Sequence, residues 1–147
     1  MPDDCLFCRI AAGSTEASVV YEDESSLAFL DHRPLFVGHT LLIPKAHVET
    51  LADLPADQVQ PLFTNAQDLC RAVEEALGAD GTFVAINNRI SQSVPHLHVH
   101  VVPRRTKDGL RGFFWPRVKY HDAKETESVR ISVRNAMMRW KTSRPAV

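Results

Sequence analysis

Three histidines that alternate with apolar residues are the groups in this chain best suited to chemistry. They are His96, His98 and His100, and an apolar residue follows each of them. Side chains of an extended strand point alternately to its two faces, so the three imidazoles share one side, roughly 6.7 Å apart, opposite an apolar side. Imidazole is largely neutral near pH 7 and acts as nucleophile, proton carrier or metal ligand. The pattern therefore favours phosphate chemistry or a metal site over a chance row of surface histidines.

A second reactive group is the pair Cys5 and Cys8, which two residues separate. Two thiolates fill only half of a tetrahedral zinc site, so the pair does not specify a metal by itself. The third cysteine, Cys70, stands apart, and an odd number of cysteines argues against a disulfide framework. No strand–helix–strand pattern surrounds the pair, which argues against a thioredoxin-like redox site. Half of a metal site and two buried thiols remain as the two interpretations.

A basic and aromatic segment, residues 104–119, follows the histidines. Its basic residues are Arg104, Arg105, Lys107, Arg111, Arg117 and Lys119, against the single acid Asp108. Such a segment suits a polyphosphate tail, or a second nucleoside stacked on Phe114 or Trp115. A solvated loop whose aromatic residues pack on a dimer partner is an equal alternative, and contact with RNA is a minor one. The sequence leaves the role of this segment open.

Length and composition limit the class of protein. With 147 residues and a mass of 16.5 kDa, the chain is expected to form a single domain over residues 1–147. Its hydrophobic fraction of 44% and its formal net charge of −1 give no general attraction to nucleic acids or membranes. No apolar run approaches the ~20 residues that span a bilayer, and the first residues are acidic where a secretory signal would be basic. A cytoplasmic protein without a membrane segment is expected.

Five strands are expected to carry or surround these groups. Apolar patterning places them at residues 18–22, 26–31, 39–44, 82–88 and 96–103. A polar turn joins the first two, so the first three strands are expected to form an antiparallel meander. The three histidines lie on the fifth strand.

A long helix is expected over residues 55–77. Apolar residues recur there at helical spacing, with Cys70 on the core side, and Gly78 ends the pattern. Pro61 lies inside this helix and has no N–H to donate, which predicts a bend there or a start nearer Gln60.

Two further helices flank this framework. A short helical turn covers residues 7–12, and a last helix opens at Asp122, with Glu125 as its capping partner. One face of the last helix is apolar and consists of Val129, Val133, Ala136, Met137 and Trp140. The chain thus has mixed secondary structure with apolar faces on both helices and strands.

The segment from Gln92 to Pro103 resembles the signature of the histidine triad (HIT) family. The resemblance extends upstream, in the same order, to Cys5–Ile10, Ala28–Pro34 and Gly38–His47, and it covers roughly two thirds of the chain. It implies an α+β, HIT-like fold with a five-stranded antiparallel sheet and one long helix, to which this chain adds a C-terminal helix. It also implies a homodimer that acts on nucleoside phosphoramidates, dinucleoside polyphosphates or related nucleotidyl compounds.

The resemblance also assigns roles by position. His98 corresponds to the nucleophile, and His100 to a residue that contacts the phosphate beside it. Asp31 corresponds to the residue that holds the ribose hydroxyls, although it could instead start a turn, and His39 lies near the phosphates. Contacts with the phosphate and leaving group correspond to Asn87, Gln92 and Ser93. This region departs from the family pattern, because it is about two residues shorter and Ser91 replaces a glycine.

The resemblance also completes a metal site. In one branch of the HIT family, and in the related galactose-1-phosphate uridylyltransferases, the histidine after Pro-Lys-x and the first triad histidine join the cysteine pair. Here the implied ligands are Cys5, Cys8, His47 and His96. Four protein ligands leave no open position for water, so zinc would be structural. No organic cofactor is expected.

The leading hypothesis is a nucleotide hydrolase or nucleotidyl transferase. His98 would attack the α-phosphate of a small-molecule nucleotide substrate, and water would then cleave a covalent nucleotidyl-histidine intermediate. One alternative is a zinc-dependent hydrolase that uses all three histidines of the stripe as ligands. The other is a non-catalytic nucleotide-binding regulator. The sequence does not choose the substrate class, the base or the physiological pathway.

Overall fold

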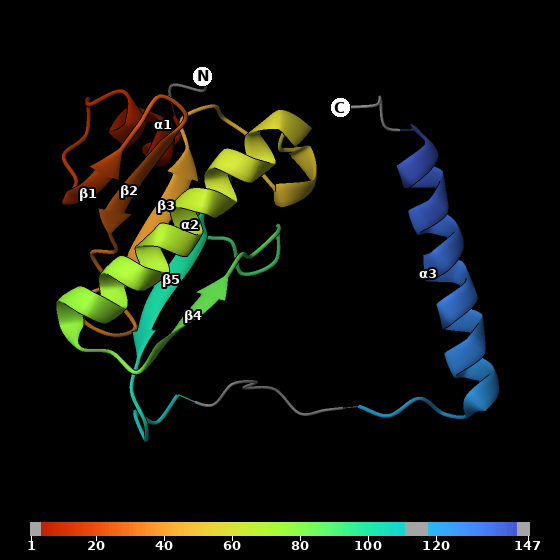
Figure 1. The fold of residues 1–147 in the computed structure, drawn as a ribbon. Coiled ribbons are helices and arrows are strands. Elements are labelled where there is room, and N and C mark those ends of the chain that lie inside the picture. Colours follow the sequence, from red (N-terminus) through yellow and green to blue (C-terminus); the bar gives the residue numbers. More distant parts are fainter. Residues whose placement is uncertain (1–3, 111–117, 144–147) are drawn as a thin grey trace. The chain divides into compact units, whose positions relative to one another are not determined.

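The computed structural model describes residues 4–110 and 118–143, and the chain divides into two compact units, residues 1–108 and 109–147 (Figure 1). The elements of the first unit are α1 (Leu6–Ala11), β1 (Val19–Glu22), β2 (Ser26–Leu30), β3 (Thr40–Pro44), the 3-10 turn η1 (Leu51–Asp53), α2 (Ala56–Leu77), β4 (Gly81–Ala85) and β5 (Val99–Arg104). The second unit contains α3 (Ala123–Ser143). That residues 1–147 form a single HIT domain stays a prediction.

The five strands form one antiparallel sheet in the order β1-β2-β3-β5-β4. The predicted sheet and its opening meander are therefore confirmed. β5 is shorter at its start than predicted, because its pairing with β3 begins at Val99 opposite Leu42. His96 and His98 precede the strand, where the N–H of Leu97 bonds to the carbonyl of Val48 at 2.7 Å. This bond holds the segment beside the sheet without extending it.

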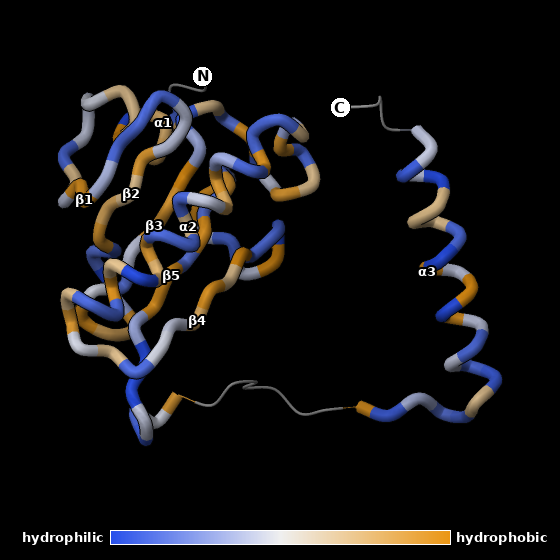
Figure 2. Tube along the Cα trace, viewed as in Figure 1, coloured by the Kyte–Doolittle hydropathy of each residue, from blue (hydrophilic) through white to orange (hydrophobic). Residues whose placement is uncertain are grey.

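Each face of the sheet has its own apolar core. The face under α2 buries Leu42, Leu97, Val99 and Val101 against the apolar stripe of that helix. The opposite face buries a second cluster against α1: Phe7, Leu27, Phe29, Leu41 and Ile43, together with both cysteines of the pair. Figure 2 shows apolar segments along the central strands β3 and β5. The alternation of side chains along β5 therefore assigns the apolar residues to the α2 face and the histidines to the α1 face.

Helix α2 spans Ala56–Leu77 and includes Pro61. The predicted range of residues 55–77 is confirmed, and the alternative of a start nearer Gln60 is wrong. Pro61 lies only five residues after the helix start, so its missing N–H removes a single backbone hydrogen bond near the N-terminal end of the helix. The buried stripe of Leu62, Ala66, Leu69 and Val73 outweighs that cost, because burial of large apolar side chains contributes about 1.5–3 kcal/mol each. Gly78 ends the helix in the left-handed conformation, with φ of 60°.

Helix α3 begins with the predicted capping pair. The Asp122 carboxylate accepts from the N–H of Glu125 at 2.7 Å, and the Glu125 carboxylate accepts from the N–H of His121 at 2.5 Å. The helix continues to Ser143, and no residue of it is buried. Among the described residues, no helix is long and apolar enough to span a membrane.

Candidate functional site

Two cysteines and two histidines from distant parts of the chain meet at one point. Cys5 and Cys8 lie at the start of α1, His47 follows β3, and His96 precedes β5. The Cys8 Sγ lies 3.3 Å from Nδ1 of His47 and 3.5 Å from Nδ1 of His96, and the Cys5 Sγ lies 3.5 Å from Nδ1 of His96. All four ligand atoms lie within 4.8 Å of one another. The predicted ligand set is therefore brought together.

The orientation of His96 in this cluster fits a metal ligand. Its Nε2 donates to the carbonyl of Pro44 at 2.8 Å, which leaves the Nδ1 lone pair directed at the thiols. Burial raises the pKa of the Cys8 thiol to about 11, so a cation is needed there to stabilise the thiolate. Two soft sulfur donors and two imidazole nitrogens in a buried, closed group match the chemistry of a structural zinc site.

His98 is held by one ring nitrogen and presents the other. Its Nδ1 donates to the carbonyl of His96 at 2.7 Å, so the neutral ring carries its lone pair on Nε2. Within the described part of the chain, Nε2 has no hydrogen-bond partner. The side chain is only 3% exposed, and the edge of the Phe7 ring packs against it at a centroid distance of 5.2 Å. The ring is therefore oriented by the protein, with Nε2 as its unengaged nitrogen.

His100 ends a chain of hydrogen bonds that passes through His39. The N–H of Leu35 donates to Nδ1 of His39 at 3.2 Å, which requires Nε2 of His39 to carry its proton. That Nε2 lies 2.9 Å from Nδ1 of His100 and donates to it. His100 therefore carries its own proton on Nε2, which is buried and has no hydrogen-bond partner among the residues that the structure describes. Asp31 lies beside this chain, with its carboxylate 3.7 Å from Nδ1 of His39.

Burial favours the neutral form of both the His39 and the His100 ring. It lowers the pKa of His39, and the nearby Asp31 offsets only part of that effect. It also lowers the pKa of His100 to about 4, and the charges of His98 and His39 act in the same direction. A buried N–H without a partner is rare in proteins and marks a place where a ligand atom can bind. The Nε2–H of His100 thus offers a hydrogen bond to an anion.

The two nitrogens form a complementary pair. The ring centroids of His98 and His100 are 4.8 Å apart. The first ring has a lone pair on its Nε2, and the second has a proton on its Nε2. A group that is attacked by the first nitrogen and gains negative charge can receive a hydrogen bond from the second. This arrangement suits attack on a phosphorus or carbonyl centre.

The three histidines of the stripe do not share a metal site. His96 faces the cysteine pair, His98 bonds to a backbone carbonyl, and His100 bonds to His39. Among the described residues, the groups that could hold a metal are the Cys5–Cys8–His47–His96 set and a set of Asp31, His39 and His100. The geometry therefore does not favour the alternative in which one zinc binds all three histidines of the stripe.

The loop that was expected to contact phosphate is held largely by its own hydrogen bonds. The Asn87 side chain donates to the carbonyl of Ser91 at 3.3 Å. The Gln92 side chain accepts from the N–H of Arg89 at 2.7 Å and donates to the carbonyl of Glu49 at 2.6 Å. Both ends of the Gln92 amide are therefore engaged with backbone, and its evident contribution is to the shape of the loop.

Two residues of this loop adopt left-handed backbone conformations. Arg89 has φ of 68° and Ser91 has φ of 59°, values that glycine adopts more easily. The replacement of a family glycine by Ser91 thus falls at a position where the backbone favours glycine. Ser93 is exposed and lines a depression that also includes Cys5 and His47.

Part of the basic and aromatic segment forms structural contacts. Arg104 forms a bidentate ion pair with Asp108, at 2.5 and 2.9 Å. The guanidinium of Arg105 donates to the carbonyl of Leu77 at the end of α2. Residues 111–117, with the aromatic cluster, lie outside the described residues. The role of the segment stays open.

Sequence reasoning missed Phe7 and the backbone groups that fix the histidine rings. Phe7 lies between the two cysteines and contacts both His96 and His98 by its ring edge. An apolar residue inside the cysteine motif was the available signal. The carbonyls of Pro44 and His96 have no signal in the sequence, because every residue has a carbonyl.

Comparison with known proteins identifies the class. The HIT domain family matches residues 12–107 of this chain. The chain therefore belongs to the HIT family.

Three relatives illustrate the range of that family. A HIT-like protein of Mycobacterium tuberculosis is 42% identical over 108 residues, which are 72% of this chain and 75% of the relative. An adenylylsulfatase of Arabidopsis thaliana is 35% identical over 75% of this chain and 57% of its own length. The crystal structure of a zinc-bound histidine triad family protein from Mycobacterium smegmatis has a TM-score of 0.70 and 39% identity, and the match covers 96% of this chain and 98% of that one.

Proposed function

We propose that this protein is a nucleotide hydrolase or nucleotidyl transferase that uses His98 as its nucleophile. The observation that carries the proposal concerns two neighbouring rings: within the described part of the chain, the Nε2 lone pair of His98 and the Nε2–H of His100 both lack a protein partner. The family supports a nucleotide substrate, since a relative is named an adenylylsulfatase. The substrate class we propose is a nucleoside phosphoramidate or a dinucleoside polyphosphate.

The proposed reaction has two displacements at the α-phosphorus. The Nε2 lone pair of His98 forms a bond to phosphorus, and the bond from phosphorus to the leaving amine or phosphate breaks. The leaving group takes the electron pair of that bond and a proton from the solvent or from a neighbouring acid. Water then attacks the nucleotidyl-histidine, releases the nucleoside monophosphate and returns the lone pair to His98. Both displacements place extra negative charge on the phosphoryl oxygens.

The remaining residues bind and orient in this proposal. The Nε2–H of His100 donates to a phosphoryl oxygen, and His39 keeps His100 in the required tautomer. Asp31 accepts from the ribose hydroxyls. Asn87 and Ser93 contact the phosphate or leaving group, together with backbone N–H groups of the loop. Gln92, which the family resemblance places among these contacts, also holds the loop through its backbone bonds.

We propose a structural zinc ion at Cys5, Cys8, His47 and His96. The closed donor set supports this assignment, as does the zinc-bound M. smegmatis relative. Zinc would fasten α1 to the segment that carries His98, because its ligands come from both. No step of the proposed reaction passes through the metal.

We further propose that the protein is a cytoplasmic homodimer with a small-molecule nucleotide substrate. Three free cysteines, two of them in a candidate metal site, suit a reducing compartment. The family resemblance supports the dimer.

A substrate panel with single-turnover trapping tests the function. An adenosine phosphoramidate, a dinucleoside tetraphosphate and a nucleotidyl sugar, each carrying a labelled nucleotidyl group, are mixed with enzyme and quenched in base, where phosphohistidine survives. We expect label on the intact protein with at least one phosphoramidate or polyphosphate, and no label on His98→Ala. Turnover without any trapped label in burst-phase samples would argue against the covalent route. Binding of all three compounds without turnover would favour the regulatory alternative.

A further inference from the structure

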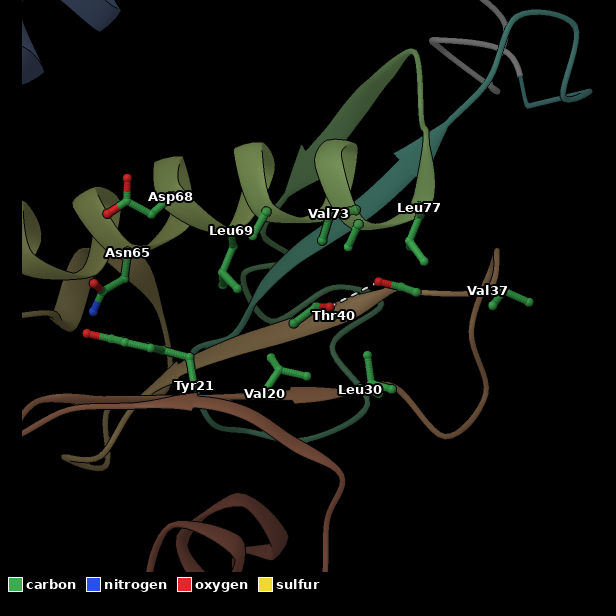
Figure 3. A pocket seen from close by; sticks show the side chains of 13 residues that line it. Val20, Tyr21, Leu30, Val37, Thr40, Asn65, Asp68, Leu69, Val73 and Leu77 are labelled. Carbon is green, nitrogen blue, oxygen red and sulfur yellow. Dashed lines mark hydrogen bonds between the residues drawn. The ribbon is translucent and has the colours of Figure 1, made fainter.

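An apolar groove lies on the α2 face of the sheet, opposite the histidines (Figure 3). It has a volume of about 460 Å³ and runs between α2 and the first two strands. Its apolar wall consists of Val20, Leu30 and Val37 on one side and Leu69, Val73 and Leu77 of α2 on the other. Helix α2 packs mainly on β3, β4 and β5. Beside it, β1 and Leu30 at the end of β2 stay exposed, whereas Ala28 of β2 is buried under the helix.

The groove exposes large apolar side chains next to one another. Val20 is 49% exposed, Leu30 is 41% exposed and Val37 is 83% exposed. Single exposed apolar residues are normal on a protein surface, whereas several that line one groove mark a site of interaction.

Helix α3 has a matching apolar stripe. Val129, Val133, Met137 and Trp140 recur at helical spacing on one side of this helix, and Trp140 is 71% exposed. Ile131, 43% exposed, lies on the opposite side. An amphipathic helix gains most of its stability from packing its apolar face, so the stripe requires a partner surface.

We propose that the groove of each copy receives the apolar stripe of α3 from a second copy. The lengths agree: the groove follows α2 from Asn65 to Leu77, roughly 18 Å, and the stripe from Val129 to Trp140 is roughly 17 Å long. Both surfaces are present on every chain. A symmetric pair of copies therefore covers two grooves and two stripes in one closed dimer.

Charge favours this occupant and sets its direction. Near the Asn65 end of the groove, the carboxylate of Asp23 accepts hydrogen bonds from Asn65 and Ser25, both uncharged. Burial opposes its ionisation, but these bonds outweigh burial and hold the pKa of Asp23 at about 2. The last turns of α3 carry Arg139 and Lys141 beside the Trp140 end of the stripe. Opposite charges therefore meet when α3 lies antiparallel to α2 of the other copy.

Trp140 reports directly on the contact. The chain has two tryptophans, so Trp115→Phe leaves Trp140 as the single fluorophore. Acrylamide quenching is measured on the full-length protein from about 1 µM to about 100 µM, in parallel with light scattering. We expect the quenching constant of Trp140 to fall at least about twofold as the mass rises from one copy to two.

Variants locate the surface that shields Trp140. Val20→Arg and Leu30→Arg place a cation in the groove at exposed positions. Val133→Asp places an anion on the apolar stripe of α3. Each is expected to abolish the concentration-dependent shielding. Ile131→Asp is the matched control, because it adds the same charge to the other side of α3 and leaves the shielding unchanged. Circular dichroism verifies that each variant is folded.

A mixing experiment separates contact between copies from contact within one copy. Val20→Arg has an intact stripe and Val133→Asp has an intact groove, so a mixture of the two restores shielding of Trp140 only if the contact joins two copies. Shielding of Trp140 in samples that light scattering finds to be monomeric would place α3 in the groove of its own chain and overturn the proposal. Concentration-dependent shielding that survives both groove variants would overturn it too, since another surface of the second copy would then cover α3. So would a Trp140 that stays fully quenchable throughout a range in which the protein is dimeric.

Discussion

The two ends of the histidine stripe differ in what the protein does with each ring. At the His96 end both nitrogens are engaged inside the protein, Nε2 by the carbonyl of Pro44 and Nδ1 by the thiols of the cysteine pair. At the His98 and His100 end each ring has one nitrogen bonded to the protein, and the other has no partner among the described residues. The same residue type at the same spacing therefore provides a closed donor set at one end and open nitrogens at the other. The tautomer of each ring is set by its hydrogen-bond partner and not by its position in the histidine stripe.

The largest effect is expected from His98→Ala. Removal of the free Nε2 should lower kcat at least ~10³-fold, on the order of 4 kcal/mol of transition-state stabilisation, while nucleotide affinity changes little. His96 is turned toward the cysteines and His100 toward His39, so neither can replace the nucleophile. Steady-state kinetics and equilibrium nucleotide binding measure the two quantities. His121→Ala, which alters an exposed histidine, is the control. A variant that keeps more than about a tenth of the wild-type kcat would show that His98 is not the nucleophile.

Loss of a cysteine should affect stability before chemistry. Elemental analysis of protein purified without chelator is expected to find about one zinc per chain. Cys8→Ser should lower both the zinc content and the Tm, by roughly 10 °C, because it breaks a buried ligand set worth several kcal/mol. The kcat of the protein that remains folded at low temperature should change less than about tenfold.

Cys70→Ser is the matched control for Cys8→Ser, since Cys70 lies outside the cluster. Well under half an equivalent of zinc in the wild type would refute the metal assignment. If Cys8→Ser had a normal Tm and no turnover, the His96 end of the histidine stripe would itself be catalytic. The contrast between a structural end and a reactive end would then disappear.

A smaller effect is expected from His39→Ala, which removes the residue that orients His100. Without the bond from His39, the His100 ring can carry its proton on either nitrogen, and the donor to the phosphate is no longer fixed. We expect kcat to fall roughly 10- to 100-fold, with KM less affected, because the hydrogen bond matters most when charge develops. His39→Gln keeps a donor near Nδ1 of His100 and should recover part of the loss. Equal losses in both variants, or a change confined to KM, would contradict a positioning role.

The smallest effect concerns pH and stability. The folded protein holds the pKa of His100 at about 4, below its ordinary value of 6.5, because the ring is buried and faces His98 and His39, with Asp31 acting weakly in the other direction. The unfolded chain therefore binds this proton first as pH falls. The contribution of His100 to stability is complete above pH 6.5 and is lost progressively from pH 6.5 to about 4. Urea midpoints at pH 7, 6 and 5 should fall less steeply for His100→Asn than for the wild type. Parallel slopes for the two proteins would show that His100 is not held neutral.

The sequence predicted the candidate site in outline. Strict alternation of three histidines determined that they share one face. The resemblance of the cysteine motif and of Gly38–His47 to the family pattern indicated which other residues could join the histidines. The structure brings Cys5, Cys8, His47 and His96 together, and it places Asp31 and His39 next to His100. The roles assigned to these residues stay predictions. The long helix was also predictable over residues 55–77, because its spacing of apolar residues is a local property. Only the alternative of a later start, nearer Gln60, was wrong.

The sequence by itself determined the strands, the amphipathic helices and the shared face of the histidines, since these follow from periodicity along the chain. Only the tertiary structure decided which nitrogen of each histidine is free, because that depends on carbonyls of Pro44 and His96 and on a ring contributed by His39. It also decided that the Gln92 amide is engaged with backbone and that an exposed apolar groove lies beside α2. Backbone groups are the same in every residue, so their part in a site emerges only when distant segments pack together.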